Sequence, residues 1–158
     1  HDMRNRPNRD AYAQRLNSEG EILWETDGVL VGEIPGADKS SVEAGSYDVQ
    51  VTGDSAGSAI VIWQVNPTSA TTGWFKGGKI YAQKLSSAGQ RLWPEAIRVY
   101  ENPSLKTQAY SSVVSDGKGG IIITSKVGTG DWPDLVYTQR LDLSGNRSWG
   151  EKGIRLNP

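Results

Sequence analysis

Residues 80–93 read IYAQKLSSAGQRLW, and this stretch decides how the chain is expected to fold because it occurs three times. Residues 11–24 read AYAQRLNSEGEILW and residues 136–149 read VYTQRLDLSGNRSW, so the three segments align without a gap. They share a tyrosine, a glutamine, a basic residue, a leucine, a glycine and a tryptophan at fixed spacing. An internal repeat of this kind points to an architecture of stacked, similar units.

Each of the three segments is predicted to begin a β-hairpin. Residues before the glycine alternate with period two, as in a strand with one buried face. Glycine is typical of the turn that follows, because positive φ costs it nothing. We call residues 11–24, 80–93 and 136–149 hairpins 1, 2 and 3. The recurring positions, predicted to be structural, are Tyr12, Gln14, Gly20, Trp24, Tyr81, Gln83, Gly89, Trp93, Tyr137, Gln139, Gly145 and Trp149.

Further strands are predicted around the repeated segments. A second strand follows each turn, at residues 21–31, 90–100 and 146–156. Two strand-like runs also precede each of hairpins 2 and 3. They are residues 47–52 and 58–65 before hairpin 2, and residues 109–115 and 120–127 before hairpin 3. Clusters of Asp and Gly join the members of each pair, as in hairpin turns. No window of helical length has apolar residues at three-to-four spacing, so an all-β chain is predicted.

The composition supports one folded unit and excludes several partners. The chain has 158 residues, of which 36% are hydrophobic, enough for a single core. A net charge of -1 provides no field that would gather nucleic acid. No apolar stretch approaches the ~20 residues of a membrane-spanning helix, so no membrane insertion is expected. Cysteine is absent, which excludes disulfides and thiolate metal sites.

The repeat resembles those of large secreted bacterial β-propeller proteins, on the strength of residues 80–93 and the preceding Ile-Val-Ile-Trp run at 60–63. It is also similar to the tryptophan-docking blades of quinoprotein-like propellers, with a spacing that differs by about a residue. With the strands of a blade named a to d from the axis outward, the chain reads c-d, a-b-c-d, a-b-c-d. The resemblance implies a propeller fragment of about two and a half four-stranded blades, with the tryptophans packed between blades.

This interpretation divides the chain into four parts: a tag remnant and loop tail at 1–9, a half blade at 10–32, and blades at 45–100 and 107–158. Propellers typically need 4–8 blades to close. We therefore expect a piece of a longer chain or, as the less favoured alternative, self-association through an open blade edge. The resemblance also implies an extracellular or cell-surface location.

The sequence contains no recognisable catalytic or cofactor-binding motif. His1 is the single histidine, which leaves no Ser-His-Asp triad and no histidine metal ligand. No phosphate-binding glycine loop is present, and no cofactor or metal is expected. Carboxylate pairs of the glycosidase kind stay open, because they are recognised by separation in space. Five aspartates are expected to form ordinary Asx turns rather than calcium sites: Asp54, Asp116, Asp131, Asp134 and Asp142.

The family geometry places the candidate ligand face on the loops. It implies that the b-c loops at 66–78 and 128–134 share one face with the d-a loops. The candidate ligand residues are Trp74, Phe75, Asp131, Trp132 and Asp134. Exposed aromatic rings suit stacking on sugars or anchoring of a protein partner, whereas the alternative is that each ring covers its own blade.

Three hypotheses for the function follow. The first is a non-enzymatic extracellular or cell-surface module that binds protein or carbohydrate, because the recurring residues are structural and the variation lies in loops. The second is a fragment of a secreted carbohydrate-active, glycosidase-like propeller enzyme. The third is purely structural: an engineered or excised repeat unit, for which a dimer or trimer would indicate ring completion between chains and a monomer would indicate an open half-propeller.

Overall fold

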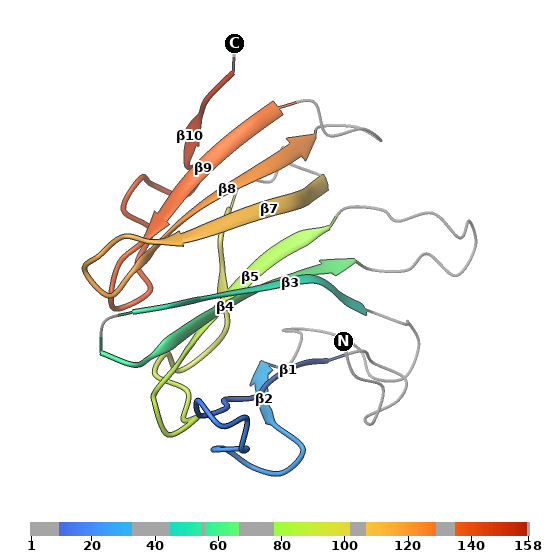
Figure 1. Cartoon of the computed structure of the whole chain (residues 1–158). Coiled ribbons are helices and arrows are strands. Elements are labelled where there is room, and N and C mark those ends of the chain that lie inside the picture. Colours follow the sequence, from blue (N-terminus) through green and yellow to red (C-terminus); the bar gives the residue numbers. More distant parts are fainter. Residues whose placement is uncertain are drawn as a thin grey trace.

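The described residues of the chain form three antiparallel β-sheets (Figure 1). The computed structural model describes residues 10–32, 45–54, 56–66, 78–101, 107–128 and 135–157. Within these residues there is no helix, so the all-β prediction is confirmed. The strands are β1 (Ala11–Ala13), β2 (Val29–Gly32), β3 (Gly45–Gly53), β4 (Ala59–Asn66), β5 (Lys79–Leu85), β6 (Ile97–Arg98), β7 (Thr107–Ser115), β8 (Ile121–Gly128), β9 (Leu135–Leu141) and β10 (Ile154–Arg155).

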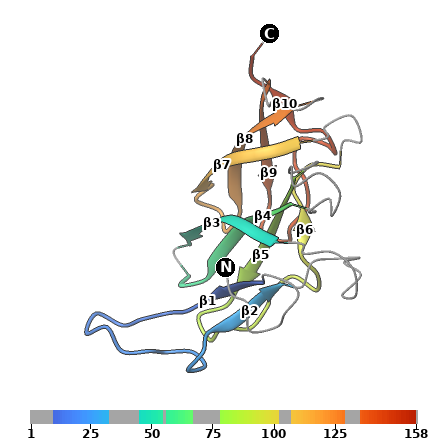
Figure 2. The ribbon, with the colours of Figure 1, turned by 90° about the vertical axis from the view of Figure 1, so that its right-hand side faces the viewer.

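Every described sheet joins strands that are neighbours in the sequence. The first sheet pairs β1 with β2, the second has the order β3-β4-β5-β6, and the third has the order β7-β8-β9-β10. None of the three closes on itself. Figures 1 and 2 show the sheets following one another from the N-terminal to the C-terminal end of the molecule. Their bounds fall within the segments 10–32, 45–100 and 107–158.

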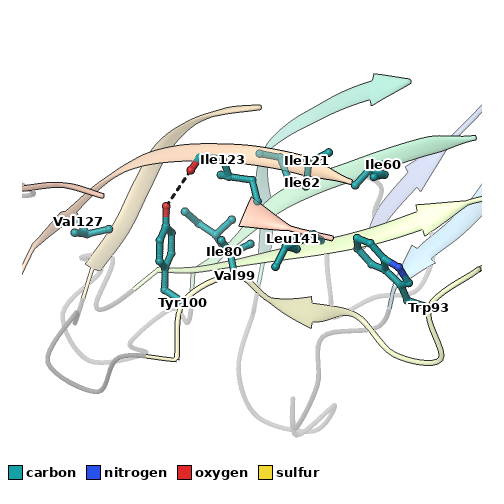
Figure 3. Packing of buried hydrophobic residues seen from close by; sticks show 11 residues of the cluster. Ile60, Ile62, Ile80, Trp93, Val99, Tyr100, Ile121, Ile123, Val127 and Leu141 are labelled. Carbon is teal, nitrogen blue, oxygen red and sulfur yellow. Dashed lines mark hydrogen bonds between the residues drawn. The ribbon is translucent and has the colours of Figure 1, made fainter. Parts of the chain in front are cut away.

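The second sheet is covered on both faces. In β4, Val61, Trp63 and Val65 pack toward β1 and β2, in a cluster with Ala11 and Val31. Alternate residues of β4 point the other way, and Figure 3 shows them in a second cluster with residues of β8 and β9. A strand buried on both faces needs an unbroken apolar run. The sequence Ile-Val-Ile-Trp at 60–63 meets that need.

Hairpin 2 therefore differs from the prediction of one buried face per strand. Ile80 and Ala82 of β5 belong to the cluster shared with the third sheet. Tyr81 packs toward the first sheet, with its ring stacked on Trp63 at a centroid distance of 6.1 Å. Period-two alternation predicts one strand face toward the core and one toward solvent. In β5, instead, one face packs toward the third sheet and the other toward the first sheet.

The strand after each turn is much shorter than predicted. The ranges 21–31, 90–100 and 146–156 reduce to the short strands β2, β6 and β10. Between turn and strand, a single bridge joins the two arms of each hairpin: Leu16 to Ile22, Leu85 to Arg91, and Leu141 to Arg147. Between this bridge and the short strand, the second arm does not continue the backbone ladder with the first arm. The side chain of the repeated glutamine, Gln14, Gln83 or Gln139, bonds to the backbone of the second arm instead.

The first strands of the two larger sheets lie against each other. β7 contacts β3, β4 and β5 of the second sheet. β3 has an irregular register between Tyr47 and Gln50, and β7 has one at the corresponding place. At this irregularity the Asp48 carboxylate accepts a hydrogen bond from the Ser111 N–H at 3.2 Å, and the Gln50 amide donates to the Ser111 carbonyl. The two sheets are thus joined at their first strands, β3 and β7.

Candidate functional site

The predicted ligand residues lie outside the described part of the chain: Trp74, Phe75, Asp131, Trp132 and Asp134. The strands that flank them are described. β4 and β8 end, and β5 and β9 begin, on the same side of the molecule (Figure 1). The connections that carry these residues therefore leave the two larger sheets on one common side.

The repeated glutamine connects the two arms of each hairpin. The Gln14 Oε1 accepts the N–H of Trp24 at 3.2 Å, and its amide donates to the Glu25 carbonyl at 2.6 Å. Gln139 repeats both bonds, with the Trp149 N–H at 3.2 Å and the Gly150 carbonyl at 2.6 Å. Gln83 donates to the Trp93 carbonyl at 3.2 Å. A primary amide has both a donor and an acceptor, so it substitutes for a backbone neighbour.

The repeated tryptophan connects one hairpin to the next. The indole N–H of Trp24 donates to the Ser87 carbonyl at 3.0 Å, and that of Trp93 donates to the Leu143 carbonyl at 3.1 Å. Both acceptors precede the turn glycine of the following hairpin by two residues. Both rings lie against that glycine: a Cβ added at Gly89 or Gly145 would approach the indole to 3.1 or 3.2 Å. We call this pairing of tryptophan and next turn the Trp-turn joint.

The repeated basic residue also reaches the next unit. Lys84 is 2% exposed, and its ammonium donates to the Gly119 carbonyl in the turn between β7 and β8 at 2.7 Å. It also forms a 3.0 Å ion pair with Asp54 of its own sheet. Arg15 donates to the Ser87 carbonyl at 2.9 Å. The charges in this region therefore serve contacts within the chain.

Asp54, Asp116 and Asp142 form Asx turns. In each, the Oδ1 accepts the N–H groups two and four residues later, at 2.8–3.0 Å. Burial alone would raise the pKa of Asp116, but the backbone N–H of Lys118 and the guanidinium of Arg140 hold that pKa below its usual value. The pKa of Asp54 is likewise lowered, because the bonds from Lys84 and Ser58 outweigh burial. In the described ranges no group of acidic or imidazole side chains is arranged to hold a metal ion.

An open groove with a volume of about 570 Å³ lies between residues 95–101 and residues 145–151. Glu101 forms two ion pairs there, one with nearby Arg98 at 2.9 Å and one with Arg147 of hairpin 3 at 3.0 Å. Arg147 also donates to the Arg98 carbonyl at 2.9 Å. Burial raises the pKa of Tyr81, which lines the groove, and nearby Arg98 opposes this while Glu101 adds to it. These contacts of Arg147 with Glu101 and Arg98 hold hairpin 3 against the segment around β6.

Tyr100 is a further connection that the repeat did not predict. It is fully buried, and its hydroxyl donates to the Tyr137 carbonyl at 3.1 Å, so it ties the segment that follows β6 to β9. The hydroxyl also lies 3.4 Å from the Ile123 carbonyl (Figure 3). Burial raises the pKa of Tyr100 to about 12, although its hydrogen bond to Ser125 opposes the shift.

Two contacts escaped sequence reasoning because they belong to only two of the three hairpins. Arg91 donates to the Leu30 carbonyl of β2 at 3.3 Å, and Arg147 makes the matching contact with the Arg98 carbonyl of β6. Hairpin 1 has Ile22 at this position. The sequence feature that indicates these contacts is an arginine two positions after the turn glycine, Arg91 in hairpin 2 and Arg147 in hairpin 3.

Comparison with protein-family models, with curated proteins and with solved structures finds no match to this chain. No helix among the described residues is long and apolar enough to cross a membrane.

Proposed function

We propose that the chain is a β-propeller segment that works as a non-enzymatic, extracellular or cell-surface module for binding protein or carbohydrate. The observation that carries the proposal is the common side on which β4 and β8 end and β5 and β9 begin (Figure 1). The connections leaving there contain Trp74, Phe75 and Trp132. Functional residues concentrate in connections held by a rigid scaffold.

The blade interpretation is supported by the order of strands in the two larger sheets. Each is a meander of four consecutive antiparallel strands, as in a propeller blade. The first strands, β3 and β7, contact each other, which is how the innermost strands of neighbouring blades would meet. The extracellular or cell-surface location is supported by the resemblance of residues 80–93 to secreted propeller repeats.

The binding role is supported by how the recurring residues are used. The glutamines, the tryptophans of hairpins 1 and 2, and the turn aspartates are engaged in bonds within and between sheets. Variation between units is greatest in the connections, where aromatic residues would give large contact area at low entropic cost.

A glycan array and a secreted-protein array, each probed with the labelled chain, test the proposal. We expect binding to one class of ligand that falls at least about tenfold in the Trp74→Ala and Trp132→Ala variants. Leu92→Ala is the matched control, because Leu92 is an exposed apolar residue in the turn region of hairpin 2, away from these connections. Ligand binding unaffected by both tryptophan variants, or hydrolysis of a bound glycan, would contradict the proposal.

A further inference from the structure

The Trp-turn joint is formed twice inside the chain, with the same parts each time. One side provides the tryptophan: Trp24 in the first case and Trp93 in the second. The other side provides a turn glycine and the leucine that ends the first arm of the hairpin. That leucine, Leu85 or Leu141, is 0% exposed because the preceding sheet covers it. The joint therefore has a donor side and an acceptor side.

Hairpin 1 presents an open acceptor side. Leu16, which corresponds to Leu85 and Leu141, is 55% exposed. A Cβ added at Gly20 would meet no atom within 4 Å, whereas one at Gly89 or Gly145 would meet an indole. Ile22 beside the turn is 51% exposed as well. Leu16 and Ile22 form an apolar patch, and the counterparts of Leu16 in hairpins 2 and 3 are covered.

Hairpin 3 presents an open donor side. The Trp149 main-chain N–H is held by Gln139, as the Trp24 N–H is held by Gln14, so the ring starts from the same backbone position. Its indole N–H donates to no carbonyl in the described part of the chain, in contrast to Trp24 and Trp93. Trp149 is half-buried, as Trp24 is, so its ring is accessible from solvent.

We propose that two copies of this chain associate head to tail through a third Trp-turn joint. Trp149 of one copy packs on Gly20 of the other, beside Leu16, and its indole donates to the Ser18 carbonyl. Ser18 precedes Gly20 by two residues, as Ser87 and Leu143 precede their glycines. A second copy is the occupant that fits, because each copy carries both complementary halves at opposite ends of the molecule (Figure 2).

The intermolecular joint lacks a hydrogen bond that both internal joints have. Ile22 stands where Arg91 and Arg147 donate to a carbonyl of β2 and of β6, respectively. The new joint exchanges that hydrogen bond for an apolar contact, and it lacks the covalent connection that raises the effective concentration of the internal halves. Association is therefore expected to be concentration-dependent. A head-to-tail contact uses different surfaces on the two partners, which distinguishes it from a two-fold symmetric dimer.

Sedimentation velocity of the whole chain over a range of concentrations tests the proposal. We expect the mass of the unaltered chain to rise above that of a monomer as concentration increases. Leu16→Glu destroys the acceptor side and Trp149→Ala destroys the donor side, so each variant alone should remain monomeric. An equimolar mixture of the two variants should form a dimer, since one intact donor and one intact acceptor remain.

Leu92→Glu is the matched control for Leu16→Glu, because Leu92 is 49% exposed in hairpin 2 but is not part of a joint. It should associate like the unaltered chain. Far-ultraviolet circular dichroism of each variant checks that the fold is kept. A monomeric unaltered chain at all concentrations, single variants that associate normally, or a mixture that stays monomeric would each overturn the proposal.

Discussion

At the scale of single residues, the repeated glutamine explains why the hairpins leave the ladder without losing hydrogen bonds. Its side chain offers a carbonyl to one backbone N–H and an N–H to one backbone carbonyl. A buried backbone group without a partner costs about 1–3 kcal/mol. The amide is thus required as a donor and an acceptor together, which the isosteric glutamate cannot provide in its ionised form.

Gln139→Glu tests this requirement. The Gly150 carbonyl, which receives the Gln139 amide at 2.6 Å, would face a carboxylate oxygen, so the folded state raises the pKa of the new carboxyl. Because the folded state raises this pKa, the unfolding free energy of the variant should be close to that of the unaltered chain below about pH 4. As pH rises toward 7 the carboxyl ionises, and the variant should lose about 1–3 kcal/mol of unfolding free energy. Denaturant titrations at several pH values measure it. Gln14→Glu is the control, since Gln14 is exposed and the penalty should be smaller.

The turn glycines separate backbone strain from side-chain contact. Gly20 and Gly145 have nearly the same φ, +85° and +87°, so alanine pays a similar conformational cost of about 1–2 kcal/mol at each. At Gly145 the added Cβ would also lie 3.2 Å from the Trp93 indole. We expect Gly145→Ala to lower the unfolding free energy by about 1–3 kcal/mol more than Gly20→Ala.

Equilibrium unfolding at low protein concentration measures this difference, because dilution keeps any association at Gly20 from contributing. Equal losses in the two variants would mean that the indole moves away at no cost and that the joint is not tightly packed.

At the scale of elements, the turn between β7 and β8 depends on a carboxylate with two roles. Asp116 caps the turn through its Oδ1, and its Oδ2 pairs with Arg140 of β9 at 2.7 Å. Asp116→Asn keeps the capping oxygen but loses the ion pair. We expect it to lower the unfolding free energy at pH 7 by about 1–3 kcal/mol.

The pH dependence of that loss follows from the lowered pKa of Asp116. The pair stabilises the fold above the pKa of about 3.9 that an unfolded aspartate has, and the stabilisation is lost as pH falls through the folded value. The difference between Asp116→Asn and the unaltered chain should therefore be largest near pH 7 and shrink below about pH 4. Asp142→Asn is the control, because Asn17 already caps the equivalent turn of hairpin 1. An equal loss in the control would contradict the role of the ion pair.

The element scale also shows what the sequence could predict. Strand order, turn positions and the three hairpins follow from the Tyr, Gln, Gly and Trp spacing, since that spacing is a local property of the chain. The short length of β2, β6 and β10 does not follow from that spacing. The amide of Gln14 or Gln139 replaces ladder hydrogen bonds only where the two arms of its hairpin lie side by side, which the sequence does not show. The two covered faces of β5 were also missed, since alternation does not say what lies beyond each face.

The joint illustrates the same limit for the site. Leu16, Leu85 and Leu141 are identical in pattern, yet one is exposed and two are buried. Only the neighbouring sheet distinguishes them, and its position is a property of the whole chain. The predicted ligand residues on the connections, among them Trp74 and Trp132, lie outside the described residues and stay predictions.

At the scale of the whole molecule, the three sheets share faces in series. The second sheet has a partner on each side, and the first sheet has two strands among the residues that the structure describes. A two-stranded sheet is marginal alone and depends on the surface it packs against. In stacked units of this kind, stability is approximately a sum of unit and neighbour terms. The central sheet should therefore open only in global unfolding.

Native-state hydrogen exchange is expected to show this gradient, and one variant tests its cause. Trp63 is fully buried in the cluster that joins β4 to the first sheet, and a Cβ added at Gly32 would approach its ring to 3.0 Å. Trp63→Ala removes that contact but leaves the junction between the second and third sheets. The amides of β1 and β2 should exchange at least about tenfold faster in the variant, whereas those of β8 should change much less. Equal acceleration in β2 and β8 would mean that the sheets unfold as one cooperative unit, because coupling in series predicts a loss confined to the junction that was cut.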